Sequence, residues 1–194
     1  MRQYPMSLSA GVKVITGLVV VLLCSVPLLV WGFFPGIAIG GPSGPAGPGV
    51  QLATRLGTLL APILALACWA LSPRAVELEG GELKVLRRAW PAAAYRLSEL
   101  ERVEVLPPGW LSGALRTFGN GGLFGYYGWF YKKGAFRLFA TRSDRLVEAV
   151  IGGKRVVFSP DDPARFAEAV LAAAPRARRA QGGDDGAASA TRTS

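Results

Sequence analysis

Few residues of this chain have side chains suited to catalysis. The 194 residues include no histidine, which removes the commonest general base and metal ligand. The two cysteines, Cys24 and Cys68, lie in apolar runs without a neighbouring cysteine or histidine, so neither a zinc site nor a disulfide is indicated. Glu99, Glu101 and Glu104 have the spacing of a solvated face. We therefore expect no enzyme activity, no metal and no cofactor.

The glycine-rich stretch GNGGLFGYYG is the nearest match to a nucleotide-binding motif. It departs from the dinucleotide fingerprint because Phe124 stands where the third glycine is required. Gly153-Lys154 is followed by Arg155 and has no glycine at the spacing of a phosphate-binding loop. Glycines of turns and bulges explain both stretches better than a nucleotide site does.

Aromatic and basic side chains form the candidate binding surface. An aromatic segment ends in a basic turn and continues to Arg137, and two later turns are also basic. The residues that we select for a partner or lipid surface are Tyr127, Trp129, Tyr131, Lys132, Lys133, Arg142, Arg145, Lys154 and Arg155. Such side chains can lie at a lipid interface or stack on a partner. Alternatively, alternate aromatics fill the core of a sheet while Lys132 and Lys133 only solvate a turn.

The charge distribution divides the chain into two parts. The net charge is +9, and no acidic residue precedes Glu77. A basic excess favours anionic surfaces such as lipid or nucleic acid. The basic residues are neither dense nor part of a recognised nucleic-acid module, so we do not expect nucleic-acid binding.

Two apolar runs near the N-terminus are long enough to cross a membrane. The first extends from Val14 to Phe34, and the second lies between Arg55 and Arg74. About 20 apolar residues span the hydrocarbon core as a helix. A cleaved signal peptide is the alternative for the first run, which is longer than the roughly 7–15 apolar residues of such peptides.

Basic residues flank the outer ends of the two runs, which predicts that the chain crosses the membrane twice with both termini on the cytoplasmic side. The expected order is a short cytoplasmic N-terminus (1–13), a first membrane helix (14–34), a Gly/Pro-rich external loop (35–55), a second membrane helix (56–73), a globular domain (74–174) and a disordered basic tail (175–194).

The globular part has the pattern of short strands followed by one helix. Hairpin turns are predicted at Gly80-Gly81, Lys133-Gly134 and Gly152-Gly153. Cap residues in 159–163 precede a helical repeat of apolar residues from Phe166. The predicted fold class is therefore α+β, with about seven antiparallel strands in a barrel or sandwich capped by a C-terminal helix.

Several of these motifs resemble the bacterial pleckstrin-homology-like (PH-like) domain families. They are the turn LFGYYG at 123–128, the strand end Ala140-Thr141, the turn Gly152-Gly153-Lys154, and the cap Ser159-Pro160-Asp161-Asp162-Pro163 with Phe166. The resemblance implies a PH-like fold, often preceded by one or two membrane spans. It implies no defined activity. Phosphoinositide-binding members usually carry basic residues in the first hairpin, where this chain has Glu79-Gly80-Gly81-Glu82, so specific inositol-phosphate recognition is not expected.

The sequence thus predicts a membrane-tethered PH-like module that binds a protein partner without catalysis. One alternative is a peripheral sensor of anionic lipid, which uses the basic and aromatic residues. Another is an accessory subunit whose spans pack against other membrane proteins.

Overall fold

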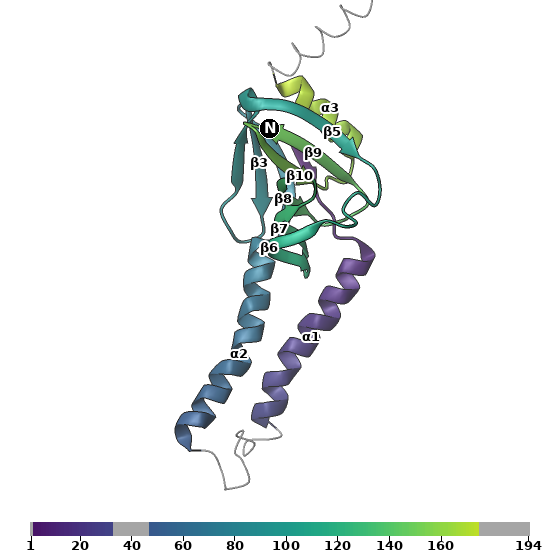
Figure 1. The fold of residues 1–194 in the computed structure, drawn as a ribbon. Coiled ribbons are helices and arrows are strands. Elements are labelled where there is room, and N and C mark those ends of the chain that lie inside the picture. Colours follow the sequence, from purple (N-terminus) through teal and green to yellow (C-terminus); the bar gives the residue numbers. More distant parts are fainter. Residues whose placement is uncertain (1, 33–46, 175–194) are drawn as a thin grey trace, which may run out of the picture.

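The computed structural model describes residues 2–32 and 47–174 (Figure 1). Two long helices extend side by side from one end of a β-rich domain. The described chain begins at Arg2, in an edge strand of that domain. Expectations for residues 33–46 and for the tail at 175–194 fall outside the described residues.

The two helices are α1 (Ala10–Gly32) and α2 (Pro48–Leu71). Both are long and apolar enough to cross a membrane. Helix α2 starts eight residues before the expected second span, because Pro48 at its first position is compatible with a helix start and the following residues continue the turn. Arg55 therefore lies inside α2 and not at its boundary.

A four-stranded sheet contains a strand that the sequence did not indicate. Its order is β1 (Arg2–Pro5), β2 (Pro73–Glu79), β3 (Glu82–Arg87) and β4 (Ala93–Arg96). The N-terminal residues, for which the sequence predicted only a short cytoplasmic segment, pair antiparallel with β2, from Arg2 opposite Leu78 to Pro5 opposite Ala75. Four residues without a flanking turn motif are too few to show a strand pattern.

The segment that follows β1 is fixed by side chains and by the backbone. The Met6 N–H donates to the Arg74 carbonyl at 3.0 Å, and the Met6 side chain is buried. The Ser7 N–H and hydroxyl both donate to the Asp161 carboxylate, at 2.9 and 2.6 Å. The chain before α1 is thus part of the same core as the chain after α2.

The second sheet has six strands in the order β5-β9-β10-β8-β7-β6. Their bounds are β5 (Leu100–Leu106), β6 (Leu115–Gly122), β7 (Gly125–Tyr131), β8 (Ala135–Ala140), β9 (Leu146–Ile151) and β10 (Lys154–Phe158). The prediction of an antiparallel fold is wrong at one pair, because β8 and β10 run parallel. With β4 and β6 not recognised in the sequence, the estimate of about seven strands was also too low.

The three predicted hairpin turns are confirmed. Gly80-Gly81 joins β2 to β3, Gly152-Gly153 joins β9 to β10, and all four glycines have positive φ. Lys133 and Gly134 likewise have positive φ between β7 and β8. A two-residue turn with positive φ at both positions matches the twist of the strands it connects.

The C-terminal helix α3 (Pro163–Ala173) covers the core as predicted. The Asp162 carboxylate accepts the Arg165 N–H at 3.1 Å, which confirms Asp162 as the cap, whereas Asp161 holds Ser7. Phe166 is fully buried against the rings of Tyr4 and Phe158 at centroid distances of 5.2 and 6.0 Å. The core therefore joins β1, both sheets and α3.

We expect the Met6→Ala variant to lose about 2–5 kcal/mol of unfolding free energy, because a buried side chain is removed from the core. The exposed Gln3 on the preceding strand β1 gives the matched control, Gln3→Ala, with a change within about 0.5 kcal/mol. Chemical denaturation of the full chain in a mild detergent measures both. Equal losses in the two variants would contradict the packing of the N-terminal segment described above.

Candidate functional site

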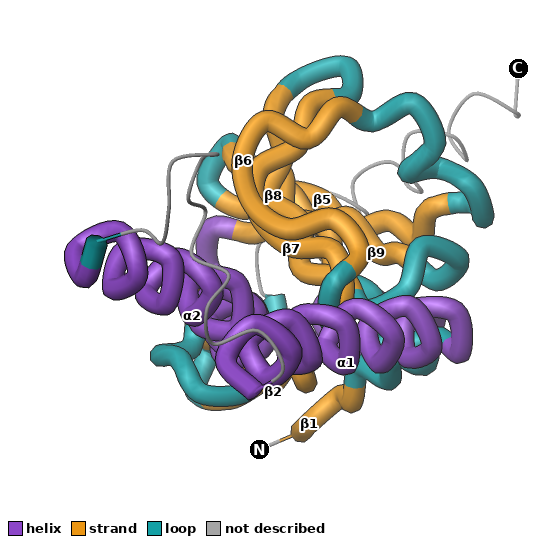
Figure 2. The backbone as a smooth tube through the Cα atoms, turned by 90° about the horizontal axis from the view of Figure 1, so that it is seen from below, coloured by secondary structure: helices purple, strands orange, loops and turns teal. Residues whose placement is uncertain are grey.

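The β6–β7 hairpin contacts both long helices. The Phe124 N–H donates to the Thr16 hydroxyl of α1 at 3.0 Å, and the Tyr127 hydroxyl donates to the Cys68 carbonyl of α2 at 2.6 Å. The Asn120 amide donates to the Tyr127 oxygen at 3.2 Å. In the view from below, β6 and β7 lie next to the helices (Figure 2). The hairpin therefore fixes the β domain on the helix pair.

Glycine is required where β6 and β7 face each other. Gly119 and Gly128 are register partners with φ of 116° and 131°. A Cβ on Gly128 would lie 2.2 Å from the Phe118 carbonyl oxygen, which real structures do not tolerate. The interpretation of this stretch as turn glycines is confirmed at Gly122 and Gly125, which flank the β6–β7 turn and have positive φ.

Tyr127, one of the selected surface residues, is buried between the sheet and α2. Its side chain belongs to the main core cluster. Burial is the largest cause that raises the pKa of the Tyr127 hydroxyl, followed by its hydrogen bond to Cys68, so the group is neutral and acts as a donor. Tyr127 positions the domain and is not available to a partner in this structure.

Trp129 and Tyr131 are exposed further along β7. Trp129 lies opposite Phe118 and Tyr131 opposite Leu115 on the neighbouring strand β6. Tyr127 is buried whereas Trp129, two residues along on the same face of the strand, is exposed, so the environment of this face changes along β7. The aromatic segment therefore packs into the core at Tyr127 and is exposed on the surface at Trp129 and Tyr131.

The basic turn between β7 and β8 is partly engaged in the fold. The Lys132 ammonium donates to the carbonyls of Trp110 and Ser112 and lies 5.3 Å from the centroid of the Trp110 ring. Lys133 is exposed. Lys132 thus fastens the loop after β5, and Lys133 is the member of the turn that is free to meet a ligand.

Arg155 is likewise held by neighbouring groups. Its Nε donates to the Glu148 carboxylate at 2.7 Å, and its Nη1 donates to the Lys132 carbonyl at 3.0 Å. The Glu148 side chain is 4% exposed and also pairs with Arg102 at 3.4 Å. Lys154 is exposed and has no ion pair within the described part of the chain. Arg155 and Lys154, although adjacent in sequence, therefore have different environments.

Arg142 and Arg145 lie apart from Lys154 and Arg155. The first two belong to the turn before β9, and the second two follow β9, so the pairs are at opposite ends of that strand. Arg142 forms a two-point ion pair with Asp144 at 3.0 and 2.8 Å, which lowers the pKa of that carboxyl. Arg145 donates to the Asp161 carbonyl at 2.8 Å. The selected basic residues therefore do not form one surface.

The structure brings together two other arginines that were not selected as site residues. Arg87 at the end of β3 and Arg137 on β8 both lie over the Phe139 ring, at 5.6 and 5.2 Å from its centroid. They line a cavity beside α2 together with Trp129. The sequence contained no signal for this pairing, because the two strands belong to different sheets and are about fifty residues apart.

The comparisons with known proteins give one match. A family model described as Bacterial PH domain matches residues 75–174, which runs from β2 to the end of α3. No curated protein and no solved structure matches the chain. The matched region begins after α2 and excludes β1, although β1 is paired with β2 in the same sheet.

Neighbouring substitutions distinguish a structural cation from a surface cation. Arg155→Ala leaves the buried Glu148 with only Arg102, and we expect a loss of up to about 3 kcal/mol, the lower end of the cost of breaking a buried pair. Lys154→Ala should change stability by no more than about 0.5 kcal/mol. Thermal unfolding of the full chain compares the two. Arg155→Ala as mild as Lys154→Ala would show that Arg155 is a free surface residue.

Proposed function

Because the chain belongs to the bacterial PH domain family, we propose that it is a membrane-anchored, non-catalytic module that binds a protein partner at the cytoplasmic face. The partner-binding element in this proposal is the exposed edge strand β6. The observation that carries it is the exposure of two large apolar side chains on that strand, Leu115 at 67% and Phe118 at 75%.

The surfaces of α1 and α2 favour membrane anchoring. Leu18, Leu28 and Leu66 are among many large apolar side chains of these helices that no other part of the described chain covers. A contiguous apolar surface of this length is unfavourable in water and favourable in lipid. If α1 were cleaved as part of a signal peptide, β1 would be removed with it, and the core would lose Tyr4 and Met6. The structure therefore favours retention of α1.

Basic residues lie at the ends of α1 and α2 that adjoin the β domain. Lys13 and Arg74 lie at that end of α1 and α2, and Arg88 follows β3 beside it, donating to the Ser72 hydroxyl at 3.0 Å. Lysine and arginine concentrate on cytoplasmic flanks, which supports a cytoplasmic β domain. A domain held there needs only a weak contact to bind a membrane-localised partner, because the tether raises the effective concentration.

The two edges of the six-stranded sheet differ in protection. β5 carries Glu101, Arg102 and Glu104 and packs against α3. Charged side chains and a covering helix are common ways to prevent unwanted strand pairing. β6 has one charged residue, Arg116, and all of its residues from Leu115 to Gly119 are exposed. An extended segment of a partner could add to β6 by backbone hydrogen bonds, with side-chain contacts to Leu115 and Tyr131.

A photo-reactive residue at position 115 of the full-length chain tests this proposal in native membranes. We expect a covalent adduct with one defined protein, and none from position 105, since Val105 is an exposed residue of the protected edge β5. Tyr131→Asp places a charge opposite Leu115 and should lower the adduct yield without lowering the melting temperature.

Equal adducts from positions 115 and 105 would contradict a specific edge contact. An adduct yield that Tyr131→Asp leaves unchanged would contradict it as well, because Tyr131 lies directly across from the cross-linking position.

A further inference from the structure

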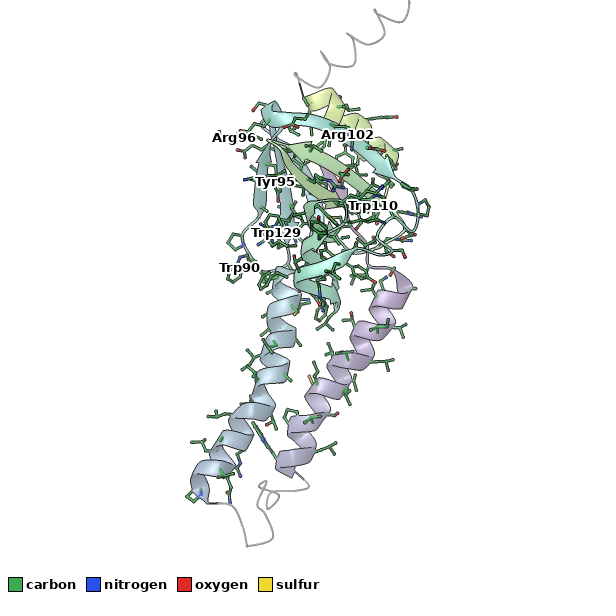
Figure 3. All side chains as sticks on the ribbon, in the orientation of Figure 1. Trp90, Tyr95, Arg96, Arg102, Trp110 and Trp129 are labelled. Atoms are coloured by element: carbon green, nitrogen blue, oxygen red, sulfur yellow. The ribbon has the colours of Figure 1, made fainter. Side chains whose placement is uncertain are left out.

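A cavity lies between the C-terminal part of α2 and the middle of strands β6, β7 and β8. Its volume is about 380 Å³, and its walls include Leu64, Ala67 and Leu71 of α2 together with Phe118 and Trp129. Figure 3 shows Trp129 at the lower end of the β domain, toward α2. Sites for small molecules have volumes of about 300–1,000 Å³ and mostly apolar walls. The cavity is thus of suitable size and sits where the proposed membrane span meets the domain.

Two guanidinium groups face this apolar cavity without a carboxylate. Arg87 and Arg137 both line it, and neither forms an ion pair with any described residue. The Arg137 Nε is buried and has no hydrogen-bond partner among the described residues. Arg137 is stacked on the Trp129 and Phe139 rings, at 5.4 and 5.2 Å from their centroids. The rings hold the guanidinium in place but cannot satisfy its in-plane N–H groups.

The local electrostatics favour an added anion. Arg87 and Arg137 are both half-buried and lie over the same ring, and burial, followed by repulsion from Arg137, lowers the pKa of Arg87. Arginine nevertheless stays protonated in proteins. The nearby Tyr95 is neutral, because burial raises the pKa of its hydroxyl. Two positive charges therefore share a partly desolvated site that contains no negative side chain.

We propose that this cavity binds an anionic membrane lipid, with its phosphate between Arg87 and Arg137 and its acyl chains along the apolar face of α2. The inference rests on the membrane anchoring proposed above. Arginine pairs recognise phosphate oxygens by forked, charge-assisted hydrogen bonds. A soluble phosphate offers the same headgroup chemistry, but it would leave the walls formed by Leu64, Leu71 and Phe118 in contact with water.

The basic turns lie further from α2 than this cavity does, and Lys154 and Arg155 line a neighbouring cavity that shares Arg137 and Trp129 with it. Lys132, Lys133 and Lys154 lie at the ends of β7 and β10 that are remote from the α2 contact of Tyr127. Arg137 lies on β8 opposite Trp129, between that turn and the helix contact. A lipid in the leaflet can reach the cavity along α2 without leaving the bilayer.

Native mass spectrometry of the full-length protein in a neutral detergent tests the proposal. The probes are phosphatidylglycerol, phosphatidylcholine with the same acyl chains, and inorganic phosphate as a soluble competitor. We expect wild-type protein to retain one phosphatidylglycerol in preference to phosphatidylcholine. The double variant Arg87→Gln/Arg137→Gln should bind phosphatidylglycerol at least about tenfold more weakly, as expected for the loss of charge-assisted hydrogen bonds.

Two further variants control for charge and for folding. Lys133→Gln/Lys154→Gln removes the same charge from exposed positions and should leave the affinity unchanged. Ala67→Phe keeps both arginines and fills the cavity from an exposed position on α2, so it should also weaken phosphatidylglycerol binding. This variant tests the site even if the double arginine variant does not fold.

Equal weakening in the lysine and arginine variants would overturn the proposal, as would equal affinity for phosphatidylcholine or displacement of the lipid by equimolar inorganic phosphate. Retention of the wild-type protein in membranes after an alkaline carbonate wash distinguishes the two proposals. A retained protein that shows no preference for phosphatidylglycerol overturns the lipid site alone, whereas release by the wash overturns the anchoring as well.

Discussion

The antiparallel pairing of β1 with β2 is the constraint on which the rest of the structure depends. β1 precedes the first long helix and β2 follows the second, so their pairing requires the chain to return to its starting side. For two helices that cross a bilayer, this pairing places both ends on the same face. Tyr4 and Met6 extend the constraint into the core, where Tyr4 packs edge-on against Phe166 of the final helix. The arrangement of the two helices and the folding of the domain therefore both depend on this strand pairing.

The β6–β7 hairpin fixes the orientation of the β domain relative to α1 and α2. Phe124 and Tyr127 contact α1 and α2 respectively, and the close approach of Gly119 and Gly128 lets the two strands lie against each other there. The same hairpin then turns its exposed side chains outward, toward the proposed partner edge. The cavity with Arg137 forms where the hairpin and α2 diverge. Both proposed binding sites are therefore consequences of how the domain is seated on the helices.

Local patterns made the helices, the glycine turns and the Asp162 cap predictable, because each depends on residues close together in sequence. Non-local features were not predictable in this way. β1 is recognisable only through its partner β2, about seventy residues away, and the parallel pairing of β8 with β10 depends on the sheet order. Of the selected site residues, Trp129, Tyr131, Lys133 and Lys154 are exposed, whereas Tyr127 and Arg155 have structural contacts that spacing could not reveal. Arg87 and Arg137 meet only because two sheets pack together.

The most direct test of the account is the sidedness of both ends of the chain in intact cells. Single-cysteine variants Gln3→Cys, Gly47→Cys and Lys154→Cys, made after Cys24→Ala and Cys68→Ala, would be treated with a membrane-impermeant maleimide before and after permeabilisation. The account predicts that positions 3 and 154 are labelled only after permeabilisation and that position 47 is labelled in intact cells. Labelling of positions 3 and 154 on opposite sides of the membrane would contradict it, because β1 could then not pair with β2.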